Sequence, residues 1–142
     1  MALLHSSAVA VFTLSALGCA STFTQSVASG VQVADIVISE DDQNRTIDCN
    51  RSAIIVTGND NRLTLTGECR RLTVDGDDND INAAAVTEVA ISGDDNAIRL
   101  ETVGKIVTRG DDNSVTWTSG VGNRQPEVSD SGDDNAIRQA TK

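Results

Sequence analysis

Pairs of adjacent aspartates recur along this chain and are the residues whose types and spacing best suit a chemical role. Asp77 and Asp78, Asp94 and Asp95, and Asp111 and Asp112 each stand between a glycine and an asparagine. Calcium prefers several carboxylate and carbonyl oxygens in flexible geometry. If the pairs stack at one corner, like charges about 5 Å apart repel each other and attract a cation. These six aspartates are therefore candidate calcium ligands, and no other cofactor is expected. The alternative is that the acidic turns are simply solvated.

Few other side chains could carry out catalysis. The single histidine, His5, lies in a segment that reads as an export signal, and the chain has no tyrosine. No serine stands beside a suitable base, which removes most nucleophilic and general-base schemes. We therefore expect that the protein is not an enzyme. The alternative, a small polysaccharide-active enzyme that uses carboxylates, is disfavoured because four to five short repeats offer little surface for a sugar groove.

Charge limits the partners further. The formal net charge of the 142 residues is −10. Phosphate groups would be repelled, so nucleic acid is excluded as a partner, as is electrostatic adsorption to anionic lipid.

A repeated turn positions the aspartates. The sequence Gly-Asp-Asp-Asn or a close variant begins at Gly58, Gly76, Gly93, Gly110 and Gly132, at intervals of 18, 17, 17 and 22 residues. A period near 17 is shorter than any helical repeat and matches one coil of a β-solenoid. The long last interval predicts a bulged loop between Gly120 and Pro126.

Both flanks of each turn alternate between apolar and polar residues, which is typical of half-buried strands. The fold class is therefore all-β, and we predict a small parallel β-solenoid of about 17 residues per coil. Trp117 falls on an inward position, and the pattern decays to Asp130 and Gln139 in the last unit, as a terminal cap would. The alternative is an antiparallel β-meander of hairpins, in which each turn is an ordinary hairpin loop.

The asparagine of each turn has the parity of the inward residues that follow it. Stacked coils would place these asparagines above one another, with their amides bonded in a ladder that satisfies backbone groups at the corner. We expect the glycine to supply a positive φ and the two aspartates to stay in water. The predicted ladder consists of Asn61, Asn79, Asn96, Asn113 and Asn135.

The N-terminus reads as an export signal. Ala8 to Leu17 is a run of small and apolar residues too short to span a bilayer, and it is followed by Gly18 and Cys19. This layout resembles a bacterial lipobox, in which the cysteine is acylated and becomes the first mature residue. The alternative is ordinary secretion with cleavage after Ala20. We expect a signal segment with a lipobox at 1–19, a linker and the entry to the domain at 20–44, and the β-solenoid repeat domain with its bulged terminal coil at 45–142.

Two further cysteines, Cys49 and Cys69, form an even pair in a chain that is expected to be exported. Disulfides persist in oxidising compartments, so we expect the two to pair. The alternative is two buried free thiols.

Four parts of the chain resemble a known family. They are the segment from Asp48 to Asn61, the run from Leu65 to Cys69, the later glycine-to-asparagine turns and the closing segment from Pro126 to Gly132. Together they resemble the bacterial family of domains of unknown function numbered three thousand and sixty. The resemblance covers roughly Asp48 to Gln139. It implies a small exported β-rich domain, often found on lipoproteins, without an assigned activity, and it supports the pairing of Cys49 with Cys69.

We therefore expect a non-catalytic exported protein of the cell envelope. As a lipoprotein it would be held to the membrane through a lipid anchor on Cys19; without lipidation it would be secreted or periplasmic. The solenoid would act as a structural or adhesion module that meets an envelope protein or a polysaccharide. The alternative is a calcium-dependent binding module that uses the acidic turns.

Overall fold

The computed structural model describes residues 33–141, which are almost entirely β-structure. The strands are β1 (Ile36–Ile38), β2 (Asn44–Asp48), β3 (Ala53–Val56), β4 (Arg62–Val74), β5 (Asp80–Ile91), β6 (Ala97–Thr108), β7 (Ser114–Gly120), β8 (Glu127–Asp130) and β9 (Ala136–Gln139), with one 3-10 turn, η1 (Val121–Asn123). Within this part of the chain, no helix has the length and apolar character needed to cross a bilayer.

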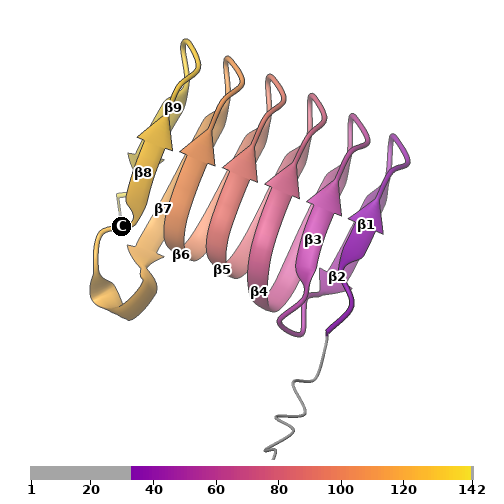
Figure 1. Ribbon diagram of the computed structural model, residues 1–142, viewed down its shortest axis with the longest axis horizontal. Coiled ribbons are helices and arrows are strands. Elements are labelled where there is room, and N and C mark those ends of the chain that lie inside the picture. Colours follow the sequence, from indigo (N-terminus) through magenta and orange to yellow (C-terminus); the bar gives the residue numbers. More distant parts are fainter. Residues whose placement is uncertain (1–32, 142) are drawn as a thin grey trace, which may run out of the picture. The chain divides into compact units, whose positions relative to one another are not determined.

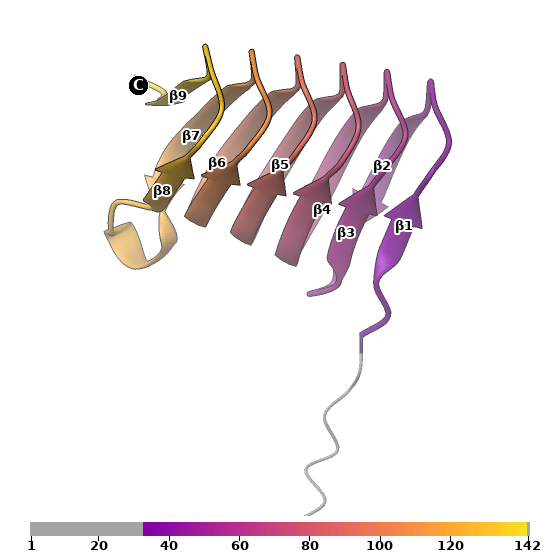
Figure 2. The same cartoon turned by 45° about the horizontal axis from the view of Figure 1, so that its top comes forward.

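All strand pairs are parallel, and each strand pairs with the equivalent segment of the neighbouring coil. Ile54 pairs with Leu72, Leu72 with Val89, and Val89 with Ile106. Figure 1 shows the result, a stack of coils whose turns form a row along one edge, and Figure 2 shows the same row from another angle. The predicted parallel β-solenoid is confirmed, and the antiparallel meander is excluded. The stack has about 6 coils of about 18 residues.

The core is a column of aliphatic side chains between the two sides of each coil. Each inward position is stacked on the same position of the next coil, so one apolar row contains Ile54, Leu72, Val89 and Ile106, all with 0 % exposure. Trp117 packs into this core with 7 % exposure. The alternation read from the sequence therefore separates inward from outward residues correctly, because side chains of a strand point to opposite faces in turn.

The first coil lies partly before residue 45, where the solenoid was expected to start. Strand β1 pairs with β3, and β2 pairs with β4, around a turn formed by residues 40–43. Residues 36–43, which lie in the segment expected to be a linker and the entry to the domain, form β1 and the first turn. An alignment on glycine missed this coil because Glu40 occupies the glycine position.

The insertion near the end of the chain is accommodated at a corner. Residues 121–126, which include η1, connect β7 to β8 as a loop that projects from the stack (Figure 1). Strand β8 still pairs in register with β6, and β9 with β7. The bulged terminal coil predicted from the sequence therefore leaves the final turn aligned with the turns of the earlier coils.

Candidate functional site: the repeated turn and the polar face

The asparagine of each repeated turn lies inside the stack. Asn61, Asn79, Asn96 and Asn113 are buried, and Asn135 in the last coil is half-buried. The Oδ1 atom of each accepts the backbone N–H of the equivalent residue one coil earlier, at 2.8 to 3.1 Å. In the last three coils the Nδ2 atom of the asparagine also donates to the backbone carbonyl of the turn glycine one coil earlier, at 2.8 to 2.9 Å. The side-chain amides thus provide partners for backbone groups at a buried corner.

The first aspartate of each turn forms a second ladder that runs in the opposite direction. Asp77 Oδ1 accepts the backbone N–H of Asp94 at 2.9 Å, and Asp94 Oδ1 accepts that of Asp111 at 2.7 Å. The same contact joins the remaining coils from Asp41 to Asp133, with Asn59 taking the aspartate position in the second coil. Both aspartates of each Asp-Asp turn are exposed, as expected, and from Asp41 to Asp111 the carboxylate of the first also accepts a backbone N–H of the next coil.

The second aspartate of each turn takes the left-handed conformation. Its φ lies between 54° and 57° in all six turns, at Asp42, Asp60, Asp78, Asp95, Asp112 and Asp134. The turn glycines have no positive φ, so the prediction that glycine supplies it is wrong. Aspartate tolerates this region better than most residues because its short side chain bonds locally.

Glycine is required for a different reason, which is the close approach of successive coils. A Cβ atom on Gly93 would overlap the carbonyl oxygen of Gly76, and a Cβ on Gly110 would overlap that of Gly93. Each turn glycine has the same relation to the coil before it. The same carbonyl oxygen receives the Nδ2 bond from Asn96 or its equivalents, so glycine and asparagine of one turn both act on the preceding coil.

The six candidate calcium ligands divide into two rows. All six are exposed, but Asp77, Asp94 and Asp111 each have one carboxylate oxygen engaged in the ladder, whereas Asp78, Asp95 and Asp112 stand at the outer edge of the turns. Desolvation first, and then the negative charges of Asp95, Asp134, Asp111 and Asp94, raise the pKa of Asp112 above its ordinary value. Across residues 33–141, no group of three or more histidines, cysteines or carboxylates is placed to hold a metal ion.

These turns carry the match to a known family. The family described as proteins of unknown function, DUF3060, matches residues 56–101 and 86–134, which include every turn from the second coil to the last glycine. The chain belongs to DUF3060. No curated protein and no solved structure matches the chain.

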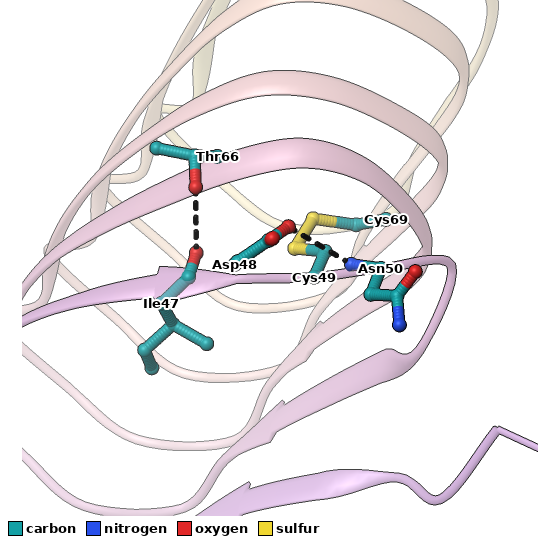
Figure 3. The surroundings of a disulfide bond; sticks show 6 residues. All are labelled: Ile47, Asp48, Cys49, Asn50, Thr66 and Cys69. Atoms are coloured by element: carbon teal, nitrogen blue, oxygen red, sulfur yellow. Dashed lines mark hydrogen bonds between the residues drawn. A yellow bond between two sulfur atoms is a disulfide. The ribbon is translucent and has the colours of Figure 1, made fainter.

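A disulfide bond fastens the first described coil, which precedes the residues matched by the family, to the second. Cys49 and Cys69 are bonded at the corner opposite the repeated turns, with 0 % and 1 % exposure and Cα atoms 4.9 Å apart. Figure 3 shows the bond beside Asp48, whose carboxylate accepts the N–H of Asn50 at 3.2 Å. In later coils Val86 and Val103 take the position of Cys69, so the disulfide fills a core position. Cys19, the predicted lipidation site, lies outside the described residues.

One lateral side of the DUF3060 stack, here called the polar face, consists of outward side chains on β4, β5, β6 and β7. A shallow groove of about 410 Å³ runs across it. Its outward lining residues are Thr64, Thr66, Asn82, Ala84, Arg99, Glu101, Thr116 and Thr118. At the edge of this face Asp80 forms ion pairs with Arg62 and Arg99. The sequence reading did not single out this face, although its residues all occupy the outward positions of the alternating pattern.

The opposite side of the stack, here called the apolar face, has a different character. Its central outward row contains Val37, Ile55, Thr73, Ala90 and Val107 in register. The neighbouring row carries the ion pairs Arg71–Glu88 and Lys105–Glu127. The two faces thus offer separate surfaces on one rigid frame.

Proposed function

We propose that this DUF3060 chain is a non-catalytic exported protein of the cell envelope, attached through acylated Cys19, whose polar face binds an envelope polysaccharide or protein. The observation that carries the proposal is the polar face itself. It places hydroxyl, amide, guanidinium and carboxylate groups across adjacent coils, about 4.8 Å apart, on a frame held by two hydrogen-bond ladders. The chain would act as a structural or adhesion module.

The chemistry of the polar face suits an extended partner with many hydroxyl or amide groups. Threonine hydroxyls and the amide of Asn82 both donate and accept hydrogen bonds, Arg99 only donates, and Glu101 only accepts. Their side chains project from strands rather than loops, so the backbone that carries them is already ordered before a ligand binds.

Export is supported by the disulfide and by the order of residues at the N-terminus. A buried bond between Cys49 and Cys69 is typical of an oxidising compartment. The apolar run that ends at Gly18 and Cys19 has the layout of a lipidation signal. The direct test is membrane fractionation of cells that express the Cys19→Ser variant, which should leave the protein in the soluble fraction. Unchanged membrane retention would contradict the lipid anchor.

A non-catalytic role is supported by the chemistry of the described residues. The cysteines at 49 and 69 are bonded to each other, and the single histidine of the chain, His5, lies outside residues 33–141. Most of the carboxylates at the repeated turns act as hydrogen-bond acceptors or stand on the exposed edge, away from the polar groove. This arrangement favours binding over a reaction.

The binding proposal can be tested by capture from envelope extracts. The full chain should retain a partner, and the variant Asn82→Ala with Thr116→Ala should lose at least tenfold of it because two hydrogen-bonding groups leave the groove. The matched control, Thr73→Ala with Ser129→Ala, removes polar groups from the apolar face and should capture normally. Protease treatment of the extract distinguishes a polysaccharide, which survives, from a protein. Equal loss in both double variants would reject the polar face as the binding surface.

Calcium enters as the second candidate, supported by the exposed row of aspartates and the raised pKa of Asp112. The capture experiment should therefore be repeated with calcium and with a chelator. In Asp95→Asn with Asp112→Asn two carboxylates of this outer row lose their charge, and asparagine tolerates the left-handed φ of both positions. Capture that requires calcium and is lost in this variant would favour the calcium-dependent module. Capture unaffected by calcium would reject it.

A further inference from the structure

The two ends of a β-solenoid are a hazard, because each end presents a strand edge that another coil can extend. Head-to-tail stacking of identical copies does not close on itself and produces filaments. In the described part of the chain, residues 33–141, the edges belong to β1 and β2 at one end and to β8 and β9 at the other. Their residues differ from those of the interior coils in ways that bear on stacking.

Glu40 is the first difference. Every turn glycine from Gly58 to Gly132 lies so close to the preceding coil that a Cβ atom would overlap a carbonyl oxygen of that coil. Glu40 occupies this position in the first coil and carries a Cβ. A coil docked in register against the first coil would therefore place its own carbonyl oxygen on the Cβ of Glu40. The collision is with backbone, which cannot move aside as a side chain can.

Charged residues in the inward rows are the second difference. Arg45 occupies the row of Leu63 and Ile81, and Asp130 occupies the row of Ile91 and Thr108. Both are exposed because no further described coil covers them. In a head-to-tail stack the same registers would bring Arg45 against Ile137 of the other copy and Asp130 against Ile38. Each charge would then be buried on an apolar neighbour, which is strongly unfavourable.

We propose that Glu40, Arg45 and Asp130 block end-to-end association of this solenoid with a second copy of itself. The block is steric and electrostatic at the first coil and electrostatic at the last. The interior ladders supply the opposite tendency, because the Oδ1 atom of Asp133 and the backbone N–H of Asn135 in the last coil are equivalent to the groups that bind the next coil elsewhere. A second copy therefore does not extend the described coils.

The test converts the ends into interior coils. The full chain carries Cys19→Ser, so that acylation adds no association of its own. The stacking variant carries Glu40→Gly, Gln43→Asn, Arg45→Leu and Asp130→Val, which gives the first turn the sequence Gly-Asp-Asp-Asn. The matched control is identical except that residue 40 is alanine, which retains the Cβ. Light scattering after gel filtration and negative-stain electron microscopy measure the assembly.

The parent chain and the alanine control should remain monomeric, whereas the glycine variant should form rods that grow with concentration. Circular dichroism of each variant in dilute solution shows whether it has kept its β-structure. A parent chain that already forms rods would overturn the proposal. A glycine variant that retains its β-structure but stays monomeric, or an alanine control that stacks equally well, would also overturn it. If the glycine variant loses its β-structure, it is replaced by a variant that carries only Glu40→Gly, Arg45→Leu and Asp130→Val. The same criteria then apply to that variant.

Discussion

At the scale of single residues, each position of the repeated turn acts on a different neighbour. The glycine and the asparagine contact the coil before their own, and the first aspartate binds the coil after it. This direction explains the first turn of the described chain. Asp41 matches the repeated sequence because its carboxylate binds the coil that follows. Glu40 and Gln43 stand in place of glycine and asparagine because no described coil precedes the first coil.

The two ladders can be compared by substitution. Asn96→Ala should lower the free energy of unfolding by about 1 to 3 kcal/mol because it leaves the buried N–H of Asn79 and the carbonyl of Gly76 without these side-chain partners. Asp94→Ala should cost less, about 1 kcal/mol, because the lost bond to Asp111 is exposed to water. Urea denaturation measures both, with Ser92→Ala as a control on the exposed end of the same turn. If the Asp94→Ala variant is as stable as the parent chain, the aspartate ladder does not contribute to stability.

The raised pKa of Asp112 predicts a pH-dependent effect of Asp112→Asn. The folded chain holds this proton more tightly than the unfolded chain, so the protonated form favours folding at low pH. That contribution is lost as pH rises through the folded pKa, which lies above the ordinary value of an aspartate. Asp112→Asn should therefore raise the melting temperature at pH 7, and the gain should shrink toward pH 3. Melting curves across this range provide the measurement; a gain independent of pH would show that charge is not its cause.

At the scale of the coil, the sequence predicted well whatever depends on local pattern. The alternation of inward and outward residues and the fixed period identified the strands, the parallel stack and the core position of Trp117. The first coil was missed because glycine and asparagine mark only turns that have a coil before them. A second signal was available, since Asp41 and Asp42 precede Asn59 and Asp60 by one period of 18 residues.

The roles of glycine and the first aspartate could not be predicted from local pattern. Glycine is common in turns because of its φ, yet here Gly93 is needed for the space beside the carbonyl of Gly76. Aspartate in a turn is usually solvated, and the bond from Asp94 to Asp111 exists only because the coils stack in one register. The polar face was missed for the same reason, since its groove depends on the register of four strands.

The close approach of coils predicts different costs for the same side chain at equivalent positions. Gly93→Ala should destabilise the fold by about 3 kcal/mol, because its Cβ would overlap the backbone of the preceding coil. Glu40→Ala, at the equivalent position of the first coil, should change stability little. Chemical denaturation of both variants measures the difference. Equal effects would show that contact between coils does not select the glycine.

At the scale of the whole molecule, each coil contacts only its neighbours, as in other solenoids, so stability is close to a sum of neighbouring terms. Terminal coils of such a stack have one neighbour and are the first to open. The disulfide joins Cys49 of the first coil to Cys69 of the second. It therefore holds the end of the described solenoid where the turn departs from the repeated sequence.

Removal of the disulfide should affect that end most. Cys49→Ser with Cys69→Ser should lower the free energy of unfolding by about 3 kcal/mol, since the bond closes a loop of 20 residues. Hydrogen exchange should accelerate in β1 and β2 more than in β5 and β6. Uniform acceleration in all strands would show that the bond does not act locally.

Ladder partners are always one coil apart, and this separation also determines how the gene for such a chain can change. Donors and acceptors within the two ladders lie 17, 18 or 22 residues apart. Tandem duplication of the stretch from Gly93 to Arg109 would insert one complete coil and return every ladder group to a partner of the same kind. Loss of a single residue from a strand would instead turn its inward side chains outward. Heritable changes in length are therefore tolerated in whole coils, and each would lengthen or shorten the lateral faces by one row.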